Sequence, residues 1–386
     1  MSATPETLAA SPSLRPPVSA RLLFAMLERT RAGRLTLRLP GGGERVFAGP
    51  EDGPHAELIL HDWRAVGHMM KAGDIGIAES WRDGWLETPR MTCFLLWCLA
   101  NQEAIADAFY GGRIAAFFYR VMHLLRPNTK AGARRNIQAH YDLGNDLFGL
   151  MLDPTMTYSC AFWEQPDATL EEAQRAKLRR ICDKLALGPD DHVLEIGCGW
   201  GSFALTAAGE YGARVTGLTL SPSQAELARE RVRDAGLESL VEILEQDYRD
   251  VEGTFTRVAS IEMLEAIGLA EYPTYFDAID RLLAPDGIAC IQTIGVPDDR
   301  FDRYRRTPDW IQQYVFPGSL LPSLGALAPA VGATRLMVAD VEEIGIGYAR
   351  TLRCWRENVG ANEDAIRALG YDDRFLRLWT FYLAYC

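Results

Sequence analysis

The chain has 386 residues, of which 48% are hydrophobic and 24% are charged, as in ordinary globular proteins. This length exceeds what one compact core usually holds, so two domains are expected. No apolar run reaches the roughly 18 residues that a membrane-spanning helix needs, and residues 1–20 lack the apolar stretch of a signal peptide. The eight cysteines form no CxxC pair and no Cys/His metal spacing, which predicts reduced thiols, no metal site and a cytoplasmic protein.

The first third of the chain predicts a small α+β domain. Residues 1–20 are expected to be disordered. A helix is expected over 20–29, short strands over 34–39 and 57–60, and helices over 63–71 and 91–126. The turn-rich segment 126–133 is a plausible linker, so the small domain spans 21–130.

The net charge of −12 is unevenly distributed along the chain. Residues 1–140 hold 17 basic and 13 acidic residues, whereas the remainder is strongly acidic. Segment 109–135 contains no acid and combines arginines with aromatic and aliphatic residues. A basic helix with an apolar face suits an anionic membrane surface, and a core helix with a solvated basic edge is the alternative. The acidic half disfavours binding to nucleic acid.

From about residue 131 to 386 the pattern alternates between helix and strand. Such alternation predicts a mostly parallel, doubly wound, Rossmann-like α/β sheet with right-handed crossovers. The expected strands are 192–196, 214–220, 241–245, 257–261 and 287–293, and the expected helices are 167–185, 202–211, 221–235 and 272–283.

A glycine-rich turn follows the first of these strands. Glu195 ends the strand, and Gly197, Gly199 and Gly201 give the spacing G-x-G-x-G before a helix. Glycines allow a tight turn and close backbone approach to a ligand at a helix N-terminus. The spacing resembles the first motif of S-adenosylmethionine-dependent methyltransferases, and an ordinary strand–turn–helix is the alternative.

Two further strand ends belong to the predicted cofactor site, because ligands in such sheets lie across the carboxyl ends of the strands. The second strand ends at Thr219 and Leu220, with Gln224 one helical turn on. The third ends near Asp247 and Tyr248, a carboxylate and an aromatic ring suited to an adenine; a plain turn is the alternative.

Nearly the whole chain resembles the cyclopropane-fatty-acyl-phospholipid synthase family, which includes the mycolic acid cyclopropane synthases and related lipid C-methyltransferases. Six ordered segments carry the resemblance, and together they are far more specific than the glycine turn alone. They are residues 73–84, 140–148, 157–163, 194–202, 218–224 and 348–355.

The resemblance implies a class I methyltransferase fold and a reaction. A methyl group passes from S-adenosylmethionine to a cis double bond of an unsaturated phospholipid acyl chain. The resulting carbocation loses a proton to a bound bicarbonate and closes to a cyclopropane. The implied bicarbonate-binding residues are Cys160, Glu265, Ile294 and Tyr348. The implied cofactor contacts are Tyr158, Ser159, Gly197, Gly199, Thr219, Leu220, Gln224, Asp247 and Tyr248.

The chain departs from the family pattern at three positions near these residues. Gln292 replaces the histidine expected to bind bicarbonate, and Ala266 replaces the histidine after the catalytic glutamate. Glu262 replaces a glycine. We expect Glu262 or Glu265 to help receive the proton, with or without bicarbonate; alternatively, Glu262 points to a helix N-terminus. Loss of the proton elsewhere would give a methyl- or methylene-branched chain, so a lipid C-methyltransferase is the second hypothesis.

The remaining expectations concern partners and competing functions. The enzyme is expected to associate peripherally with the inner face of the membrane, and a homodimer is possible. Methyl transfer to a soluble small molecule and a lipid-binding protein without catalysis are the competing readings. Family members continue past the segment that ends at Cys386 with a final strand, so a missing last strand or an exposed sheet edge is expected.

Overall fold

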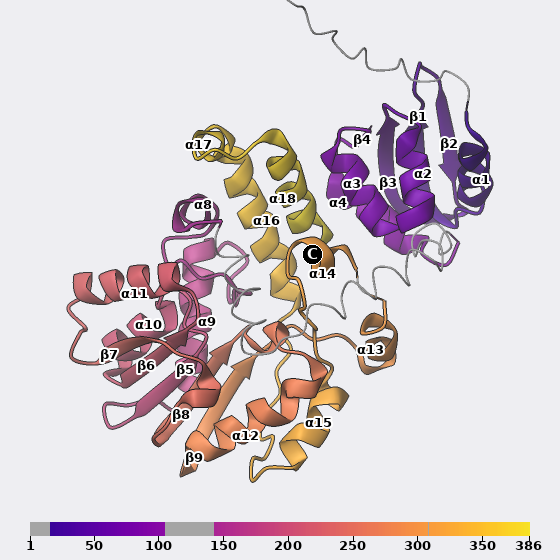
Figure 1. Cartoon of the computed structure of the whole chain (residues 1–386). Coiled ribbons are helices and arrows are strands. Elements are labelled where there is room, and N and C mark those ends of the chain that lie inside the picture. The colour runs from indigo at the N-terminus through magenta and orange to yellow at the C-terminus, as the bar shows by residue number, and fades with distance from the viewer. Residues whose placement is uncertain (1–15, 105–142, 308) are drawn as a thin grey trace, which may run out of the picture. The chain divides into compact units, whose positions relative to one another are not determined.

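The computed structural model describes residues 16–104, 143–307 and 309–386 of the chain (Figure 1). The chain divides into two compact units, of which unit 1 comprises residues 1–119 and 372–386 and unit 2 comprises residues 120–371. The predicted basic segment 109–135 and the predicted linker lie outside the described residues. No helix among the described residues is long and apolar enough to cross a membrane.

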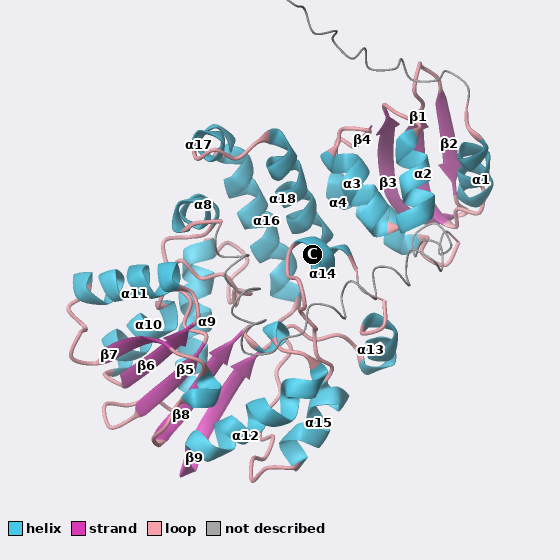
Figure 2. Cartoon of the chain, viewed as in Figure 1, coloured by secondary structure: helices cyan, strands magenta, loops and turns pink. Residues whose placement is uncertain are grey.

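Unit 1 contains a four-stranded mixed sheet with the strand order β2-β1-β3-β4 (Figure 2). Two of its strands were not predicted, because β2 buries only Phe47 and β4 has two residues. The strands are β1 Ala32–Arg38, β2 Glu44–Ala48, β3 Glu51–Leu60 and β4 Leu86–Glu87, and the helices are α1 Val18–Leu27, α2 Arg64–Ala72, α3 Asp74–Arg82, α4 Met91–Ala100 and α18 Asp373–Tyr385.

Helix α18 belongs to unit 1 although it ends the chain. The guanidinium of Arg377 lies 4.3 Å from the centre of the Trp81 ring, and the Trp81 indole N–H donates to the Arg377 carbonyl at 2.8 Å. Tyr385 donates to Asp74 at 2.9 Å. The division by contacts therefore differs from the predicted one, which assigned all residues after 130 to the second domain.

Unit 2 contains a five-stranded sheet with the order β7-β6-β5-β8-β9, in which all pairs are parallel. The predicted strands are all present, and β5 and β7 begin and end at the predicted residues. The strands are β5 His192–Ile196, β6 Arg214–Thr219, β7 Val241–Glu245, β8 Phe255–Ile261 and β9 Leu283–Gln292. The helices are α8 Asn145–Met151, α9 Leu170–Lys184, α10 Ser202–Tyr211, α11 Pro222–Asp234, α12 Tyr272–Leu282, α13 Asp298–Tyr304, α14 Trp310–Tyr314, α15 Leu324–Gly332, α16 Ile346–Ala361 and α17 Glu363–Ala368.

Hydrophobic side chains cover both faces of this sheet, which is why its strands read as continuous apolar runs. Val193 of β5 points to a cluster that includes Phe203 of α10 and Val232 of α11. Its neighbour Leu194 points to the opposite cluster, built around Ile279 of α12. This alternation along β5 fixes the sheet between two helical layers and leaves the carboxyl ends of the strands for function.

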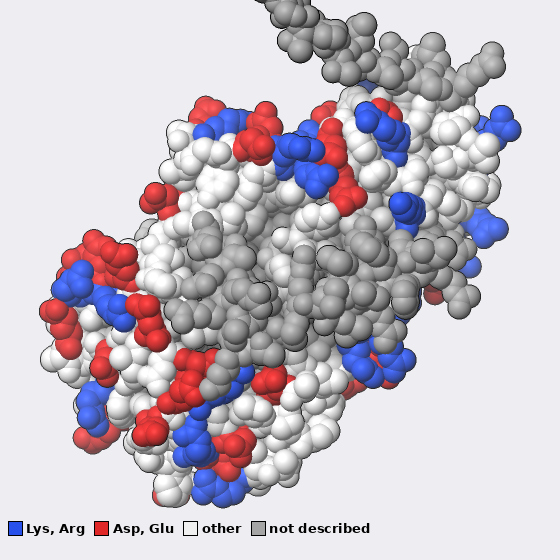
Figure 3. Space-filling model, in the orientation of Figure 1, with Lys and Arg blue, Asp and Glu red and all other residues white. Residues whose placement is uncertain are grey.

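The surface of the molecule mixes charges of both signs on the face seen in Figure 3. Unit 2 also has exposed ion pairs, such as Arg179 with Glu210 at 2.6 Å and Arg175 with Glu171 at 2.8 Å. Exposed pairs of this kind contribute little to stability.

Candidate active site

The glycine turn after β5 has the backbone that its sequence requires. Gly197, Gly199 and Gly201 all have positive φ, at 86°, 51° and 82°. A Cβ atom on Gly199 would meet no atom of the described residues within 4 Å, whereas one on Gly197 would lie 3.0 Å from the side chain of Met263. Gly199 therefore faces open space where a ligand can approach the backbone, and Gly197 keeps β5 close to the end of β8.

The end of β6 presents buried polar groups next to this turn. The hydroxyl of Thr219 donates to the Gln224 side-chain oxygen at 2.9 Å, and both residues are buried. Ser221 caps α11 by accepting from the Gln224 backbone N–H, and Pro222 occupies the first helical position. Leu220, half-buried, completes the predicted set at this strand end.

At the end of β7 the two predicted cofactor residues, Asp247 and Tyr248, already interact with other side chains of the protein. Asp247 accepts from the Arg249 guanidinium at 2.8 and 2.7 Å. Tyr248 is 7% exposed and lies against Tyr275, with ring centres 5.6 Å apart. The structure thus places Tyr248 in the core, and its contact with a cofactor stays a prediction.

Glu195 is a buried carboxyl group at the end of β5. Burial raises its pKa to about 8, against the opposing effects of the Lys177 charge and a backbone hydrogen bond at Ala204. One of its oxygens has no hydrogen-bond partner among the described residues. Glu195 is therefore a group that can hold a proton at neutral pH.

Lys177 is a functional candidate that the sequence analysis missed. It lies on α9, is 1% exposed, and donates to the hydroxyl of Ser159 at 2.7 Å. Gln174, one turn earlier, donates to the carbonyls of Thr157 and Ser159. The signal was present, because two polar residues three positions apart share the buried face of α9 with Leu178. Both hold the segment 157–160, which carries the predicted residues Tyr158, Ser159 and Cys160.

The carboxylate of Glu262 is the centre of the site. Its Oε1 accepts from the backbone N–H of Cys160 at 2.8 Å and from Nε2 of Gln292 at 2.9 Å. Its Oε2 accepts from the hydroxyl of Tyr348 at 2.7 Å. Glu262 thus joins the loop before α9, the end of β9 and the start of α16. The donors are a loop backbone N–H and two side chains, so Glu262 does not bind the backbone N–H groups of a helix N-terminus, which was the alternative expectation.

Glu265 lies beside Glu262 and is buried, whereas Glu262 is half-buried. Its Oε1 accepts from the Ile294 backbone N–H and from the Thr293 hydroxyl at 2.9 Å, while its Oε2 has no partner among the described residues. Burial, followed by the charge of Glu262, raises the pKa of Glu265 to about 8.

The two glutamates differ in how well their ionised forms are stabilised. Burial also raises the pKa of Glu262, but three hydrogen bonds and the charge of Lys177 oppose that effect. Two carboxylates in one buried site do not both ionise readily, so their environments separate their roles. The three hydrogen bonds and the charge of Lys177 therefore favour the ionised form at Glu262, whereas Glu265 is the carboxyl group that more readily keeps its proton.

Cys160 contributes its backbone and not its thiol. Burial and the nearby Glu262 raise the pKa of the thiol to about 12. The thiol donates to the carbonyl of Ala161 at 3.5 Å. A protonated thiol is a poor nucleophile, and no disulfide joins cysteines of the described residues.

Aromatic rings surround the segment that carries Cys160. Tyr158 lies with its ring centre 5.2 Å from both Phe148 and Trp355, and Trp355 also contacts Tyr348 edge-on at 6.2 Å. Phe148 contacts Trp200 of the glycine turn at 5.0 Å. The rings connect the predicted cofactor residues to the Glu262 site.

Comparison with known proteins decides the family. The family model described as mycolic acid cyclopropane synthetase matches residues 128–386. The chain belongs to this family. Its enzymes are methyltransferases of the cyclopropane-fatty-acyl-phospholipid synthase kind that depend on S-adenosylmethionine, and the chain is one of them.

The relatives of this cyclopropane synthetase family member include enzymes with different products in their names. Tuberculostearic acid methyltransferase UfaA1 of Mycobacterium tuberculosis is 39% identical over 387 residues, covering 95% of this chain and 87% of that protein. The cyclopropane-fatty-acyl-phospholipid synthase of Escherichia coli K12 is 39% identical over 319 residues, covering 82% of this chain and 80% of that protein.

The solved structure of cyclopropane synthase MmaA2 from Mycobacterium tuberculosis aligns with a TM-score of 0.61 at 30% identity, covering 65% of this chain and 91% of that one. Mycolic acid cyclopropane synthase CmaA1, complexed with SAH and CTAB, aligns with a TM-score of 0.60 at 33% identity, covering 65% and 94%. The predicted fold class is thereby confirmed.

The residues of this family member do not fit a bicarbonate ion. Three of the positions that the resemblance assigned to bicarbonate, those of Cys160, Tyr348 and Gln292 in place of the histidine, already direct hydrogen bonds to the Glu262 carboxylate. A fourth, Ile294, donates its backbone N–H to Glu265. An added anion would lose these donors and face the negative charge of Glu262.

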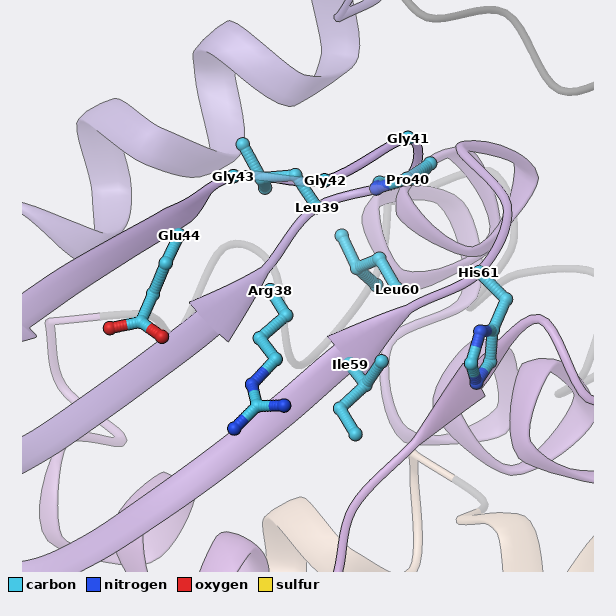
Figure 4. Close-up of a pocket in the computed structure, with 10 residues that line it drawn as sticks. All are labelled: Arg38, Leu39, Pro40, Gly41, Gly42, Gly43, Glu44, Ile59, Leu60 and His61. Carbon is cyan, nitrogen blue, oxygen red and sulfur yellow. The ribbon is translucent and has the colours of Figure 1, made fainter.

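A hollow of about 520 Å³ lies elsewhere, on unit 1 (Figure 4). It lies at the turn between β1 and β2 and is lined by side chains that include Arg38, Leu60 and His61. Arg38 pairs with Glu57, and His61 with Glu87. The charged groups of this hollow are exposed and paired, so the Glu262 site is the better candidate for the active site.

Removing the buried ammonium is expected to change the pH dependence of stability. Burial lowers the pKa of Lys177 from 10.5 to about 8, so between these pH values the unfolded chain binds more protons than the folded one. Wild-type protein gains stability from this group as the pH rises from 8 to 10.5, by up to about 1.4 kcal/mol per pH unit. Lys177→Met should lack that gain, which urea unfolding at a series of pH values measures.

The matched control is Lys184→Met on the same helix. Lys184 is paired with Asp340 and Glu342 at the surface, and its pKa is raised. Its contribution is lost only as the pH rises through that raised pKa, so the control keeps the wild-type slope between pH 8 and 10.5. An unchanged slope in Lys177→Met would contradict the assignment of a buried ammonium.

Proposed function

We propose that the chain transfers a one-carbon unit from S-adenosylmethionine to the cis double bond of an unsaturated phospholipid acyl chain, with a cyclopropane as the product. The observation that carries the proposal is the convergence of Cys160, Gln292 and Tyr348 on one half-buried carboxylate beside the glycine turn. The similarity to the Escherichia coli cyclopropane-fatty-acyl-phospholipid synthase supports the choice of substrate class.

The carboxyl ends of β5 and β6 fit S-adenosylmethionine. The open space at Gly199 admits a ligand to the backbone, and the buried polar side chains of Thr219 and Gln224 lie at the next strand end. When bound, the cofactor supplies an electrophilic methyl group. The residues that would hold it are Tyr158, Ser159, Glu195, Gly197, Gly199, Gly201, Thr219, Leu220, Gln224, Asp247 and Tyr248.

The protein's own groups have two tasks in this reaction. An alkene is a weak nucleophile, so the site must hold it close to the methyl group in a reactive orientation. The carbocation that follows must be protected from water, and the aromatic rings of Tyr158, Tyr348 and Trp355 supply an apolar, electron-rich surrounding. A buried acceptor must then take a proton. Because bicarbonate does not fit these residues, no step of the proposal uses it.

A methylene-branched acyl chain is the second candidate product. The 39% identical tuberculostearic acid methyltransferase is named for a different product, and the histidine that the resemblance expects is Gln292 here. Loss of the proton with formation of a double bond would give a methylene-branched chain. The second candidate is therefore a lipid C-methyltransferase that uses the same site.

Mass spectrometry of the product tests both candidates. Purified protein is incubated with S-adenosylmethionine and liposomes of cis-monounsaturated phospholipid, and the fatty esters are then fragmented. The expected result is a gain of one CH2 without a remaining double bond. The same gain with a retained double bond would replace the cyclopropane with the branched product, and no S-adenosylhomocysteine release would refute both. Liposomes of saturated phospholipid are the control.

The proposal extends to the membrane. The acyl substrate lies within a bilayer, and we assign contact with its anionic surface, on the inner face of the membrane, to the basic segment 109–135. This peripheral association and the possible homodimer stay predictions from the sequence. Methyl transfer to a soluble compound would instead proceed without liposomes, which the same assay distinguishes.

A further inference from the structure

We propose that the carboxylate of Glu262 is the base that removes the proton from the newly methylated acyl chain, in place of an external bicarbonate ion. This inference rests on the proposed function and names the group that completes it. Two features of Glu262 carry it: the hydrogen bonds of its side chain and the conformation of its backbone.

The hydrogen bonds leave one position on the carboxylate for a proton. A carboxylate oxygen has two lone pairs. Oε1 accepts from both Cys160 and Gln292, while Tyr348 is the one donor to Oε2 among the described residues. The remaining acceptor position therefore lies on Oε2. The donors come from three separate parts of unit 2 and fix the orientation of the group before any substrate binds, as a catalytic base requires.

The backbone of Glu262 is held in a conformation that suits glycine. Its φ is +50°, in the left-handed region that non-glycine residues rarely adopt, and its N–H donates to the Gln292 carbonyl at 2.8 Å. The resemblance expects glycine at this position. A side chain has thus been added at a position where it strains the backbone, and such strain is typical of functional sites. The carboxylate that results occupies the place where the donors of the site converge.

The charges around Glu262 favour one carboxylate and disfavour a second anion. Lys177 of α9, Tyr348 of α16, Cys160 and Glu265 are the titratable groups that act on it. Lys177 is the positive group among them, and burial together with the charge of Glu262 favours the protonated form of Glu265. A histidine would add a second positive charge for bicarbonate, but Gln292 stays neutral. The charge of Lys177 therefore balances that of Glu262, and these groups supply no second positive charge that would stabilise another anion.

The proposed step is balanced within the site. One C–H bond of the new methyl group breaks, and its electron pair forms the third bond of the cyclopropane ring. The proton passes to Oε2 of Glu262, which becomes a carboxylic acid and later releases the proton to solvent. If a hydride first shifts from the methylated carbon to the neighbouring cationic carbon, the electron pair of the same methyl C–H bond forms a C=CH2 double bond and the same base yields the methylene-branched chain, so the assignment of Glu262 holds for both products.

The experiment compares wild-type protein with Glu262→Gln in buffer freed of carbon dioxide, with and without added bicarbonate. S-adenosylhomocysteine release and the fatty esters are measured with unsaturated liposomes. Wild-type turnover should not depend on bicarbonate, and Glu262→Gln should lower turnover by about 100-fold or more with S-adenosylhomocysteine affinity unchanged. Glu343→Gln, which changes an exposed carboxylate near Cys160, is the matched control and should keep wild-type turnover.

A second variant separates a chemical role from a structural one. Glu262→Gly removes the carboxylate and suits the positive φ, so its fold is expected to be kept. Its activity should be low and should recover with added formate or bicarbonate, because a small anion can then use the vacated donors. Wild-type turnover in Glu262→Gln, or a wild-type enzyme that requires bicarbonate, would overturn the inference. A wild-type enzyme without any methyl transfer to unsaturated lipid would instead refute the proposed function.

Discussion

Replacing Gly199 by valine is expected to weaken the binding of S-adenosylhomocysteine by roughly 100-fold, because the new side chain fills the space through which the ligand reaches the backbone. In the part of the chain that the structure describes, a Cβ at this position meets no atom within 4 Å, so a valine side chain would point into that open space and not into the core. Isothermal titration calorimetry measures the affinity directly.

The control for this prediction is Gly236→Val. Gly236 follows α11, has a φ of +68° and also leaves open space at its Cβ position. A valine there meets the same backbone strain at a distance from the strand ends. The control should therefore bind S-adenosylhomocysteine as the wild type does. Equal affinities for Gly199→Val and the wild type would remove the glycine turn from the cofactor site.

Truncation of Trp355 to alanine is expected to destabilise unit 2 by about 3–5 kcal/mol, because it leaves a large cavity in the core. Trp355 is fully buried on α16 and contacts the rings of Tyr158 and Tyr348. Urea unfolding measures the loss. The transition of unit 2 is recognised as the one that S-adenosylhomocysteine shifts to higher urea, since a ligand stabilises the part that binds it.

Trp355→Phe is the matched control for the cavity. It keeps an aromatic ring against Tyr158 and Tyr348, and its Nε1 has no hydrogen-bond partner to lose among the described residues. It should be destabilised much less than the alanine variant. Similar losses in both variants would contradict a cavity mechanism and indicate a specific requirement for the indole.

Much of unit 2 was predictable because its elements have strong local signals. β5 and β7 are apolar runs bounded by turns, and both begin and end where predicted. Ser221 and Pro222 place the start of α11 by capping and by a fixed φ. The positive φ of Gly197, Gly199 and Gly201 follows from residue type and spacing, so the turn after β5 was also predictable.

Elements whose stability comes from distant contacts were not predictable in the same way. The edge strand β2 alternates weakly because only Phe47 is buried, and β4 consists of two residues that pair with β3. Helix α18 has an ordinary amphipathic pattern, and no local signal shows that Arg377 and Tyr385 bind residues some 300 positions earlier in the chain. The spacing of Lys177 places it on the same face of α9 as Leu178, but only the fold brings the hydroxyl of Ser159 within hydrogen-bond distance of its ammonium group.

The sequence by itself determined the parallel sheet, the glycine turn and the family, because hydrophobic periodicity, glycine spacing and six ordered motifs are local properties of the chain. It also identified Glu262, Gln292 and Ala266 as departures. Only the tertiary structure decided what the departures mean. The hydrogen bonds of Glu262 join residues 86 to 102 positions away in the chain, at Tyr348 and Cys160. Such partners are chosen by the folding of the sheet and its helices, since a buried carboxylate must find donors wherever the fold brings them.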